Sequence, residues 1–268
     1  AAQGHILYVT LEPCCHYGRT PPCTRAIIAA GIREVHMAML DPNPIVSGKG
    51  RAELEAASIR TILGEHEAEA REVVESYVKH ITTRRPFVTA KFAMSLDGKI
   101  ATRTFDSKWI SNERSRAYAH RLRWETDAIM VGMNTVLRDN PRLTARPPEG
   151  EREPLRIIIE SRWQTPLEAI ALQTPHRVLI AATNAIERTR ADEYARRGIE
   201  VAILPARNGQ VDLEALLVLL GQRDITSVLV EGGGTLLGSI FDLGLADKVI
   251  AFIAPMIIGG REAITPVA

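Results

Sequence analysis

Two cysteines, each directly after a proline, are the residues of this chain best suited to chemistry. Cys14 and Cys23 lie nine positions apart on a segment rich in glycine and proline, and Cys23 precedes an apolar, helix-like run at 26–30. Thr20 is expected to cap that helix, with one of the prolines that follow it as the first helical residue. Because a helix dipole stabilises a thiolate at the helix N-terminus, the pattern favours a metal-binding pair. Two buried, small apolar side chains are an equally good interpretation of the residues alone.

The second half of the chain carries a glycine run and one unusual lysine. Glu231 and the glycines at 232–234 follow an apolar strand and precede a helical pattern at 236–243. Backbone N–H groups of such a loop can approach a phosphate, although a tight turn is the simpler interpretation, and the Rossmann pattern G-x-G-x-x-G is not present. Lys91 lies in a strand-like run among apolar neighbours, where a lysine is costly unless it has a partner.

Alternating strands and helices must position these residues. The first part reads as an α/β unit, with strands at 5–10, 34–40 and 59–63 and helices at 26–30, 50–57 and 65–81. A polar, proline-containing stretch then predicts a boundary between domains at 1–83 and 84–268. The second domain reads as a three-layer α/β domain. Its expected strands are 87–94, 128–131, 155–159, 177–181, 200–204, 227–230 and 248–253, and its expected helices are 113–125, 188–196, 213–221 and 236–243.

Composition narrows the class of protein. The 268 residues are 46% hydrophobic and 24% charged with a formal net charge of +1, which is typical of a globular protein and gives no electrostatic case for nucleic acid or membrane binding. The three cysteines lie within ten residues, so a disulfide framework is not expected. With no membrane-length apolar run and no signal-peptide pattern, we expect a cytoplasmic protein, and by default a homo-oligomer.

The motifs, taken together, resemble one family. The segments 11–23 and 41–50, then 91–99, 107–110, 132–136, 139–144 and 230–234, are similar in order and spacing to the bifunctional riboflavin-biosynthesis deaminase/reductase. The resemblance covers essentially the whole chain. It implies a partial cytidine-deaminase-like domain followed by a dihydrofolate-reductase-like three-layer domain. It also implies zinc-dependent deamination of a diaminopyrimidinone ribosylamine 5′-phosphate and NADPH-dependent reduction of its ribosyl chain to ribityl.

For the deaminase domain, the resemblance implies Cys14 and Cys23 as zinc ligands. It places His16, Arg19 and Asn43 near the substrate, and Cys15 is read as a spectator. The family's His-x-Glu segment precedes the strand at 5–10, and further strands follow 266, so we expect this chain to lack flanking segments and to be a poor deaminase or none. The alternatives are a working reductase beside an inactive first domain, and a non-catalytic zinc or nucleotide-binding module.

For the reductase domain, the resemblance implies two catalytic residues, Lys91 and Glu231. The residues it places on NADPH are Ala93, Trp109, Thr135, Asp139, Ser161, Gly233, Gly234, Thr235, Leu236, Leu237 and Gly238, with Arg162 beside Ser161 at the 2′-phosphate. The residues it places on the phosphorylated substrate, in addition to Glu231, are Ser107, Arg123, Leu143 and Arg146. From the residues alone, Arg123 is a solvated charge on a helix and Trp109 a core side chain. Asp97 is expected to be a turn residue without a chemical role.

Overall fold

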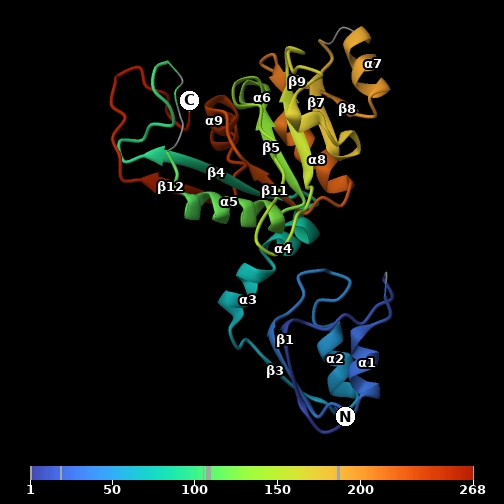
Figure 1. Cartoon of the computed structure of the whole chain (residues 1–268). Helices are drawn as coiled ribbons and strands as arrows, with labels where there is room; N and C mark the ends of the chain where they lie inside the picture. The colour runs from blue at the N-terminus through green and yellow to red at the C-terminus, as the bar shows by residue number, and fades with distance from the viewer. Residues whose placement is uncertain (1, 19, 105, 107–109, 186–187, 268) are drawn as a thin grey trace. The chain divides into compact units, whose positions relative to one another are not determined.

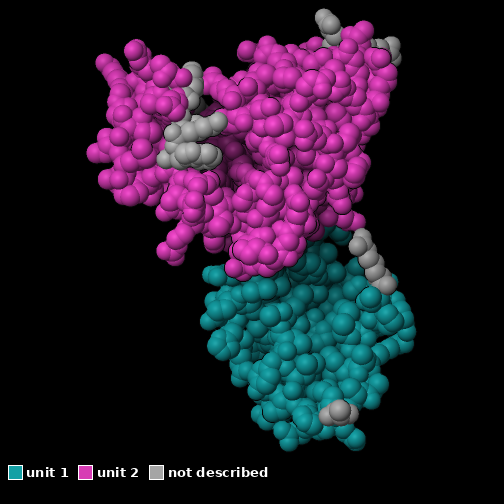
Figure 2. Space-filling view, in the orientation of Figure 1, with its two compact units in different colours: residues 1–84 teal, residues 85–268 magenta. Residues whose placement is uncertain are grey.

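The chain forms two compact units, residues 1–84 and 85–268, coloured teal and magenta in Figure 2. The structure, a computed structural model, describes residues 2–18, 20–104, 106, 110–185 and 188–267. Within these ranges no helix is both long and apolar enough to span a membrane.

Unit 1 is built on a parallel sheet of three strands in the order β1-β2-β3, namely Ile6–Leu11, Glu34–Met39 and Arg60–Leu63. Two short helices, α1 (Cys23–Ala29) and α2 (Lys49–Ala56), cover one face (Figure 1). Their apolar side chains close a small core against β1 and β2, which includes Ile27, Val35, Met37 and Leu54. Parallel strands need a crossover connection, and α1 and α2 provide it between β1 and β2 and between β2 and β3. The α/β prediction for this region is therefore confirmed.

Two local predictions for unit 1 are wrong. Thr20 does not cap α1, because the helix begins only at Cys23 and Pro22 occupies the N-cap position without a side-chain hydrogen bond. The single helix expected at 65–81 is two helices, α3 (Glu67–Val73) and α4 (Glu75–Thr83), separated at Val74, whose φ of −108° and ψ of 14° leave the helical range. The apolar spacing continues across this break, so the sequence pattern did not reveal it.

Glu12 organises the loop that faces the cysteine segment. Its buried carboxylate accepts hydrogen bonds from three backbone N–H groups, those of Asp41 (3.1 Å), Gly48 (2.9 Å) and Arg51 (2.9 Å). This brings α2 so close to the cysteine segment that a Cβ on Gly50 would lie 2.1 Å from the carbonyl oxygen of Pro13. Residue 50 therefore has no room for a side chain.

We expect Gly50→Ala to destabilise unit 1 by about 3 kcal/mol, since the clash is with backbone that cannot move away. In an ordinary helix the same change stabilises by about 0.5–1 kcal/mol, so a loss has to come from this close approach. The measurement is amide hydrogen exchange of β2 with increasing urea, and Ala52→Ser, on the exposed side of α2, is the control. Equal protection in Gly50→Ala and wild type would contradict the prediction.

Unit 2 contains a seven-stranded parallel sheet in the order β12-β4-β11-β5-β6-β7-β8. In that order the strands are Lys248–Ala254, Phe87–Ser95, Ser227–Val230, Ala128–Gly132, Leu155–Glu160, Val178–Thr183 and Glu200–Leu204. A two-stranded hairpin, β9 (Ala206–Arg207) with β10 (Gln210–Val211), follows β8. Two short 3-10 turns, Ile170–Leu172 and Pro175–Arg177, precede β7.

Helices on both faces of this sheet make a three-layer domain, as predicted (Figure 1). On one face α8 (Leu213–Gln222) and α9 (Gly234–Asp242) supply the core residues Leu216, Leu220 and Leu237. On the other face Val136 of α6 (Met133–Asp139) and Tyr194 of α7 (Arg188–Arg196) pack on β5, β6 and β7. Helix α5 (Glu113–Glu125) lies beside β12, where Tyr118 contacts Phe252 edge to face with ring centroids 5.9 Å apart.

Candidate active site

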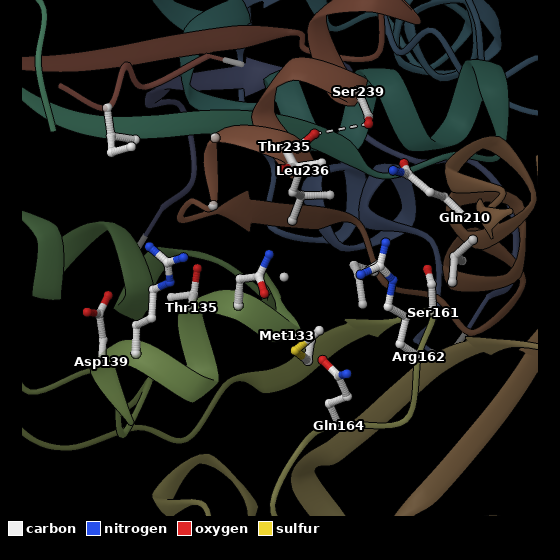
Figure 3. Close-up of a pocket in the computed structure, with 18 of the residues that line it drawn as sticks. Met133, Thr135, Asp139, Ser161, Arg162, Gln164, Gln210, Thr235, Leu236 and Ser239 are labelled. Carbon is white, nitrogen blue, oxygen red and sulfur yellow. Dashed lines mark hydrogen bonds between the residues drawn. The ribbon is translucent and has the colours of Figure 1, made fainter. Parts of the chain in front are cut away.

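A large cavity of about 1090 Å³ opens at the carboxyl ends of β5, β6 and β11 (Figure 3). Because all strands of the sheet are parallel, the loops that follow them gather at this one edge, where α/β domains commonly bind ligands. Figure 3 shows Thr135 and Asp139 of α6 on one side of the cavity, and Ser161 and Arg162, which follow β6, on the other.

The glycine loop forms the part of the cavity wall before α9. Gly232 and Gly233 have φ values of 105° and 85°, which side-chain-bearing residues rarely adopt. A Cβ on Gly233 would lie 3.3 Å from Oγ1 of Thr135, so the loop and α6 are already in close contact. Gly233 is also the N-cap of α9 and provides no side-chain hydrogen bond, which leaves the first N–H groups of the helix available to an anion.

Two further walls were not predicted. Asn208, Gly209 and Gln210 of the β9–β10 hairpin line the cavity; the Asn-Gly pair is a recognised hairpin turn signal, and both residues have positive φ. Ile100, Ala101 and Ile264 line another part, where residue 101 pairs with residue 264.

Asp97 holds the start of the segment that contributes Ile264. Its carboxylate accepts hydrogen bonds from Ser95 Oγ (2.6 Å), Ile258 N (3.1 Å) and Gly259 N (2.9 Å). These bonds, that of Ser95 first, lower the pKa of Asp97 to about 2. Asp97 therefore lies in a turn, as expected, and its carboxylate also ties that turn to the segment after β12.

Lys91 and Glu231 are brought together by strand register. Ala90 pairs with Val230 across β4 and β11, and both belong to the core under α8 and α9. Since side chains alternate along a strand, Lys91 and Glu231 project from the opposite face. There a smaller cavity of about 150 Å³ is lined by Lys91, Ala93, Phe252 and residues of α5, including His120 and Arg123.

Arg123 binds Glu231 through two hydrogen bonds, from Nε to Oε1 at 2.5 Å and from Nη2 to Oε2 at 2.7 Å, and its Nη1 donates to the carbonyl of Thr144 at 3.2 Å. The two side chains are only 17% and 7% exposed. The sequence-derived interpretation of Arg123 as an exposed charge is wrong, because all three of its nitrogens are bonded within the protein.

Burial and neighbouring charges shift the pKa values of Glu231, Lys91 and His120. Burial raises the pKa of Glu231, but the positive charges of Arg123, Lys91 and His120 outweigh it, and the net pKa lies below the ordinary value. Burial lowers the pKa of Lys91, which Glu231 partly offsets. Burial also lowers the pKa of His120, whose Nδ1 accepts a hydrogen bond from the backbone N of Arg146 at 3.3 Å. The result is a fixed carboxylate beside a lysine and a histidine with weakened basicity.

The remaining predicted residues of unit 2 differ in where they lie. Thr135, Asp139, Ser161, Gly233, Gly234, Thr235 and Leu236 all line the large cavity. Ala93 lines the small one, while Leu237, Gly238 and Leu143 are buried, with the side chains of Leu237 and Leu143 in the two cores. Arg146 is exposed, and its guanidinium contacts the hydroxyl of Thr144. Ser107 and Trp109 lie outside the described residues.

In unit 1 the structure brings the two predicted cysteines together. The backbone N of Cys23 lies 3.4 Å from Sγ of Cys14. A hydrogen bond with Cys14 and then burial raise the pKa of the Cys23 thiol, rather than lowering it as the helix-terminus argument suggested. Within the described ranges no cluster of three histidine, cysteine or acidic side chains is arranged to hold a metal.

The other predicted residues of unit 1 are partly committed to the fold. The Asn43 side chain accepts a hydrogen bond from Ile45 N at 3.1 Å, and its own backbone N donates to Asp41 at 2.9 Å, which is turn chemistry. His16 is half-buried, and its Nδ1 is shielded from solvent without a described hydrogen-bond partner. Arg19 lies outside the described residues.

The parallel sheet covered on both faces, with its large cavity beside the glycine loop, defines unit 2 as a domain of the dihydrofolate-reductase type. A riboflavin-biosynthesis reductase from Saccharomyces cerevisiae, Rib7, supports this at the level of fold, with a TM-score of 0.54 and 22% identity over 74% of this chain and 87% of that one. Residues 86–267 match the model of the RibD C-terminal domain.

Comparisons that cover nearly all of this chain show its family. Riboflavin biosynthesis protein RibD of Aquifex aeolicus is 45% identical over 96% of this chain and 71% of that protein, and RibD of Escherichia coli is 36% identical over 96% and 72%. The structure of Acinetobacter baumannii RibD, form 1, has a TM-score of 0.88 and 35% identity, covering 99% of this chain and 73% of that one. The chain belongs to the RibD family of riboflavin-biosynthesis enzymes, and it carries that family's reductase domain.

Proposed function

We propose that unit 2 is an NADPH-dependent reductase that converts the ribosyl side chain of a phosphorylated aminopyrimidine ribosylamine to ribityl. One observation carries this proposal. Glu231, held by Arg123 next to Lys91, is followed at once by the glycines that line the large cavity. A polar cluster for a reacting group and a cradle for a phosphate therefore lie on one continuous segment.

The cavity fits a dinucleotide. Gly233 and Gly234 leave backbone N–H groups free for the diphosphate, and Thr135 lies against them. Ser161 and Arg162, on the other side, are suited to the 2′-phosphate that distinguishes NADPH from NADH. When bound, the nicotinamide supplies the hydride, and the task of the protein is to bind and orient.

The residues around the small cavity take three roles in this proposal. Lys91 donates a hydrogen bond that positions and polarises the sugar oxygen at the reacting carbon. Glu231 holds a substrate hydroxyl, and Arg123 keeps the Glu231 carboxylate in one orientation through its paired contacts. Because the nitrogens of Arg123 are already bonded within the protein, we assign the binding of the substrate phosphate to the exposed Arg146.

The test is oxidation of NADPH by this polypeptide in the presence of the deaminated ribosylaminopyrimidinedione 5′-phosphate. We expect turnover that requires both molecules. NADPH binding without any turnover would mean that the domain is a nucleotide-binding module, and the absence of both would reject the proposal.

Arg146→Ala should raise the KM for this substrate about tenfold while leaving NADPH binding unchanged, because one charge-assisted contact to a phosphate is lost. Steady-state kinetics and an NADPH titration measure the two effects. Arg142→Ala, an exposed arginine on the same loop, is the control. Unchanged KM in Arg146→Ala would remove Arg146 from the substrate site.

Gly233→Ala should lower NADPH affinity about 10-fold to 100-fold, because the new methyl group closes the approach between the loop and Thr135 and strains a left-handed residue. Fluorescence titration with NADPH measures the effect. Gly244→Ala is the matched control, since Gly244 also has positive φ but has open space around its Cβ position. If both variants bind NADPH like wild type, the glycine loop is only a turn.

For unit 1, the reductase-only alternative is favoured. Cys14 and Cys23 offer two sulfur donors, whereas a catalytic zinc site uses three protein ligands, and the described residues provide no third. The residues present therefore do not fit a complete zinc site, and no deamination step is assigned to them. We expect less than one zinc per chain after dialysis and reductase turnover that a chelator does not change; one tightly held zinc per chain would reverse this choice.

A further inference from the structure

Glu160, the last residue of β6, is a buried carboxylate that the sequence analysis did not single out. The residue is 0% exposed, and no described cation forms an ion pair with it. Its Oε1 accepts a hydrogen bond from Arg162 N at 2.9 Å. Its Oε2 accepts three, from Gln164 N at 3.0 Å, Thr165 N at 2.8 Å and Thr165 Oγ1 at 2.6 Å. Because a buried charge is costly unless such bonds are made, Glu160 and the loop at 161–165 depend on each other.

The loop has a conformation that needs this support. Trp163 has a φ of 57°, a left-handed value that is uncommon for a bulky residue. Glu160 bonds the residue before Trp163 and the two residues after it, and the Trp163 ring is packed 5.9 Å from that of Tyr194. The strained turn is therefore held in place by the Glu160 carboxylate and by the contact between the rings of Trp163 and Tyr194.

The outer side of this loop faces the large cavity. Ser161, Arg162 and Gln164 all line it, and Figure 3 shows Ser161 and Arg162 across from Thr135 and Asp139. The Arg162 side chain is exposed to solvent. Its planar guanidinium is suited to a phosphate, and its position depends on the bond between its own backbone N–H and Glu160.

We propose that Glu160 is a positioning residue for cofactor selection. It holds the loop so that Arg162 and Ser161 meet a 2′-phosphate, and in this way it favours a dinucleotide that carries this group over one that does not. The proposal rests on the proposed function of unit 2, and it concerns a residue that contacts neither cofactor nor substrate.

Glu160→Gln tests this with little change of shape. A carboxamide has one oxygen, which best serves the three donors at the Oε2 position, so its NH₂ group turns toward the N–H of Arg162 and that bond is lost. We expect the affinity for adenosine 2′,5′-bisphosphate to fall about tenfold by calorimetry, with the affinity for 5′-AMP unchanged. The ratio of kcat/KM for NADPH to that for NADH should fall by the same factor.

Four further variants, one of them a double variant, separate positioning from a general loss of structure. Thr165→Val removes one bond to Oε2 but keeps the bond to Arg162 N, so it should leave the ligand preference unchanged. Arg162→Ala should itself reduce the preference, and adding Glu160→Gln to it should cause no further loss. If Glu160→Gln does not fold, Glu160→Asp, which keeps the charge but is one methylene shorter, should show the same loss of preference.

Two results would overturn the proposal: an equal loss of affinity for both ligands in the Glu160 variants, or full additivity with Arg162→Ala. Failure of the underlying function is seen separately in the wild-type protein. If wild type binds the bisphosphate no more tightly than 5′-AMP, the assignment of NADPH fails together with this inference. If wild type prefers the bisphosphate and Glu160→Gln prefers it to the same degree, only the role of Glu160 is rejected.

Discussion

Replacing Arg123 with alanine is expected to lower the free energy of unfolding of unit 2 by about 3–5 kcal/mol, because the substitution leaves the buried Glu231 carboxylate without its paired cation. The three tryptophans all lie in the second unit, so urea unfolding followed by tryptophan fluorescence measures the effect there. The reductase should lose activity as well, since the orientation of Glu231 is no longer fixed.

The loss of stability should depend on pH in a defined direction. In the wild type the pKa of Glu231 is below its ordinary value, so the pair stabilises at neutral pH and this contribution is lost as the pH falls. Without Arg123 the effect of burial dominates and raises the pKa of Glu231. The free energy of unfolding of the variant is then reduced most at high pH, and it rises again as the pH falls and the Glu231 carboxyl becomes protonated. The difference between wild type and Arg123→Ala should therefore be larger at pH 8 than at pH 5.

Two comparisons isolate the buried pair. Arg121→Ala breaks an exposed pair with Glu125 on the same helix (3.0 Å) and should leave the unfolding midpoint unchanged. Arg123→Ala combined with Glu231→Gln should recover part of the lost stability, because the unpaired charge is removed. If Arg123→Ala unfolds like Arg121→Ala at both pH values, the pair is not the stabilising element inferred here.

The elements that hold the reductase site could be predicted from sequence because each is marked by a local pattern. The helix expected at 113–125 is α5 at Glu113–Glu125, and the strand at 227–230 is β11 at Ser227–Val230. A helical apolar period or a β-branched run can be recognised within a short stretch of sequence, so these elements can be predicted without knowing the fold. The glycine run was recognisable from the residues and the resemblance assigned NADPH to it, and the structure places Gly233 and Gly234 at the cavity.

What the sequence did not reveal depends on partners far away in the chain. The bond between Arg123 and Glu231 joins residues 108 positions apart, and it forms only because β11 lies between β4 and β5. Nothing near Arg123 distinguishes it from a solvated charge on a helix. Glu160 was missed for the opposite reason, since its partners are local backbone N–H groups that leave no pattern in residue types.

Lys91→Met is expected to separate the chemistry of this site from its stability. Burial disfavours the charged form of Lys91, and the side chain already lies over an apolar ring, with Nζ 5.3 Å from the centroid of Phe252. Methionine fills similar space without the cost of burying a charge, so the midpoint of unfolding should stay the same or rise slightly. The kcat/KM for the phosphorylated substrate should nevertheless fall about 10²-fold to 10³-fold, because the donor that polarises the sugar oxygen is lost.

The matched control is Lys248→Met. Lys248 also lies over an aromatic ring of the same sheet, that of Phe87 at 5.7 Å, but it lines neither cavity, so its replacement should leave turnover unchanged. In the wild type, activity should also decline at a lower pH than an ordinary lysine would give, since burial lowers the pKa of Lys91 and its protonated form is the donor. Wild-type turnover in Lys91→Met would contradict the proposed role, because it would show that the lysine serves only packing. The expected result is loss of activity with intact stability and intact NADPH binding. It would mean that the Lys91 ammonium group acts on the substrate and not on the fold or the cofactor.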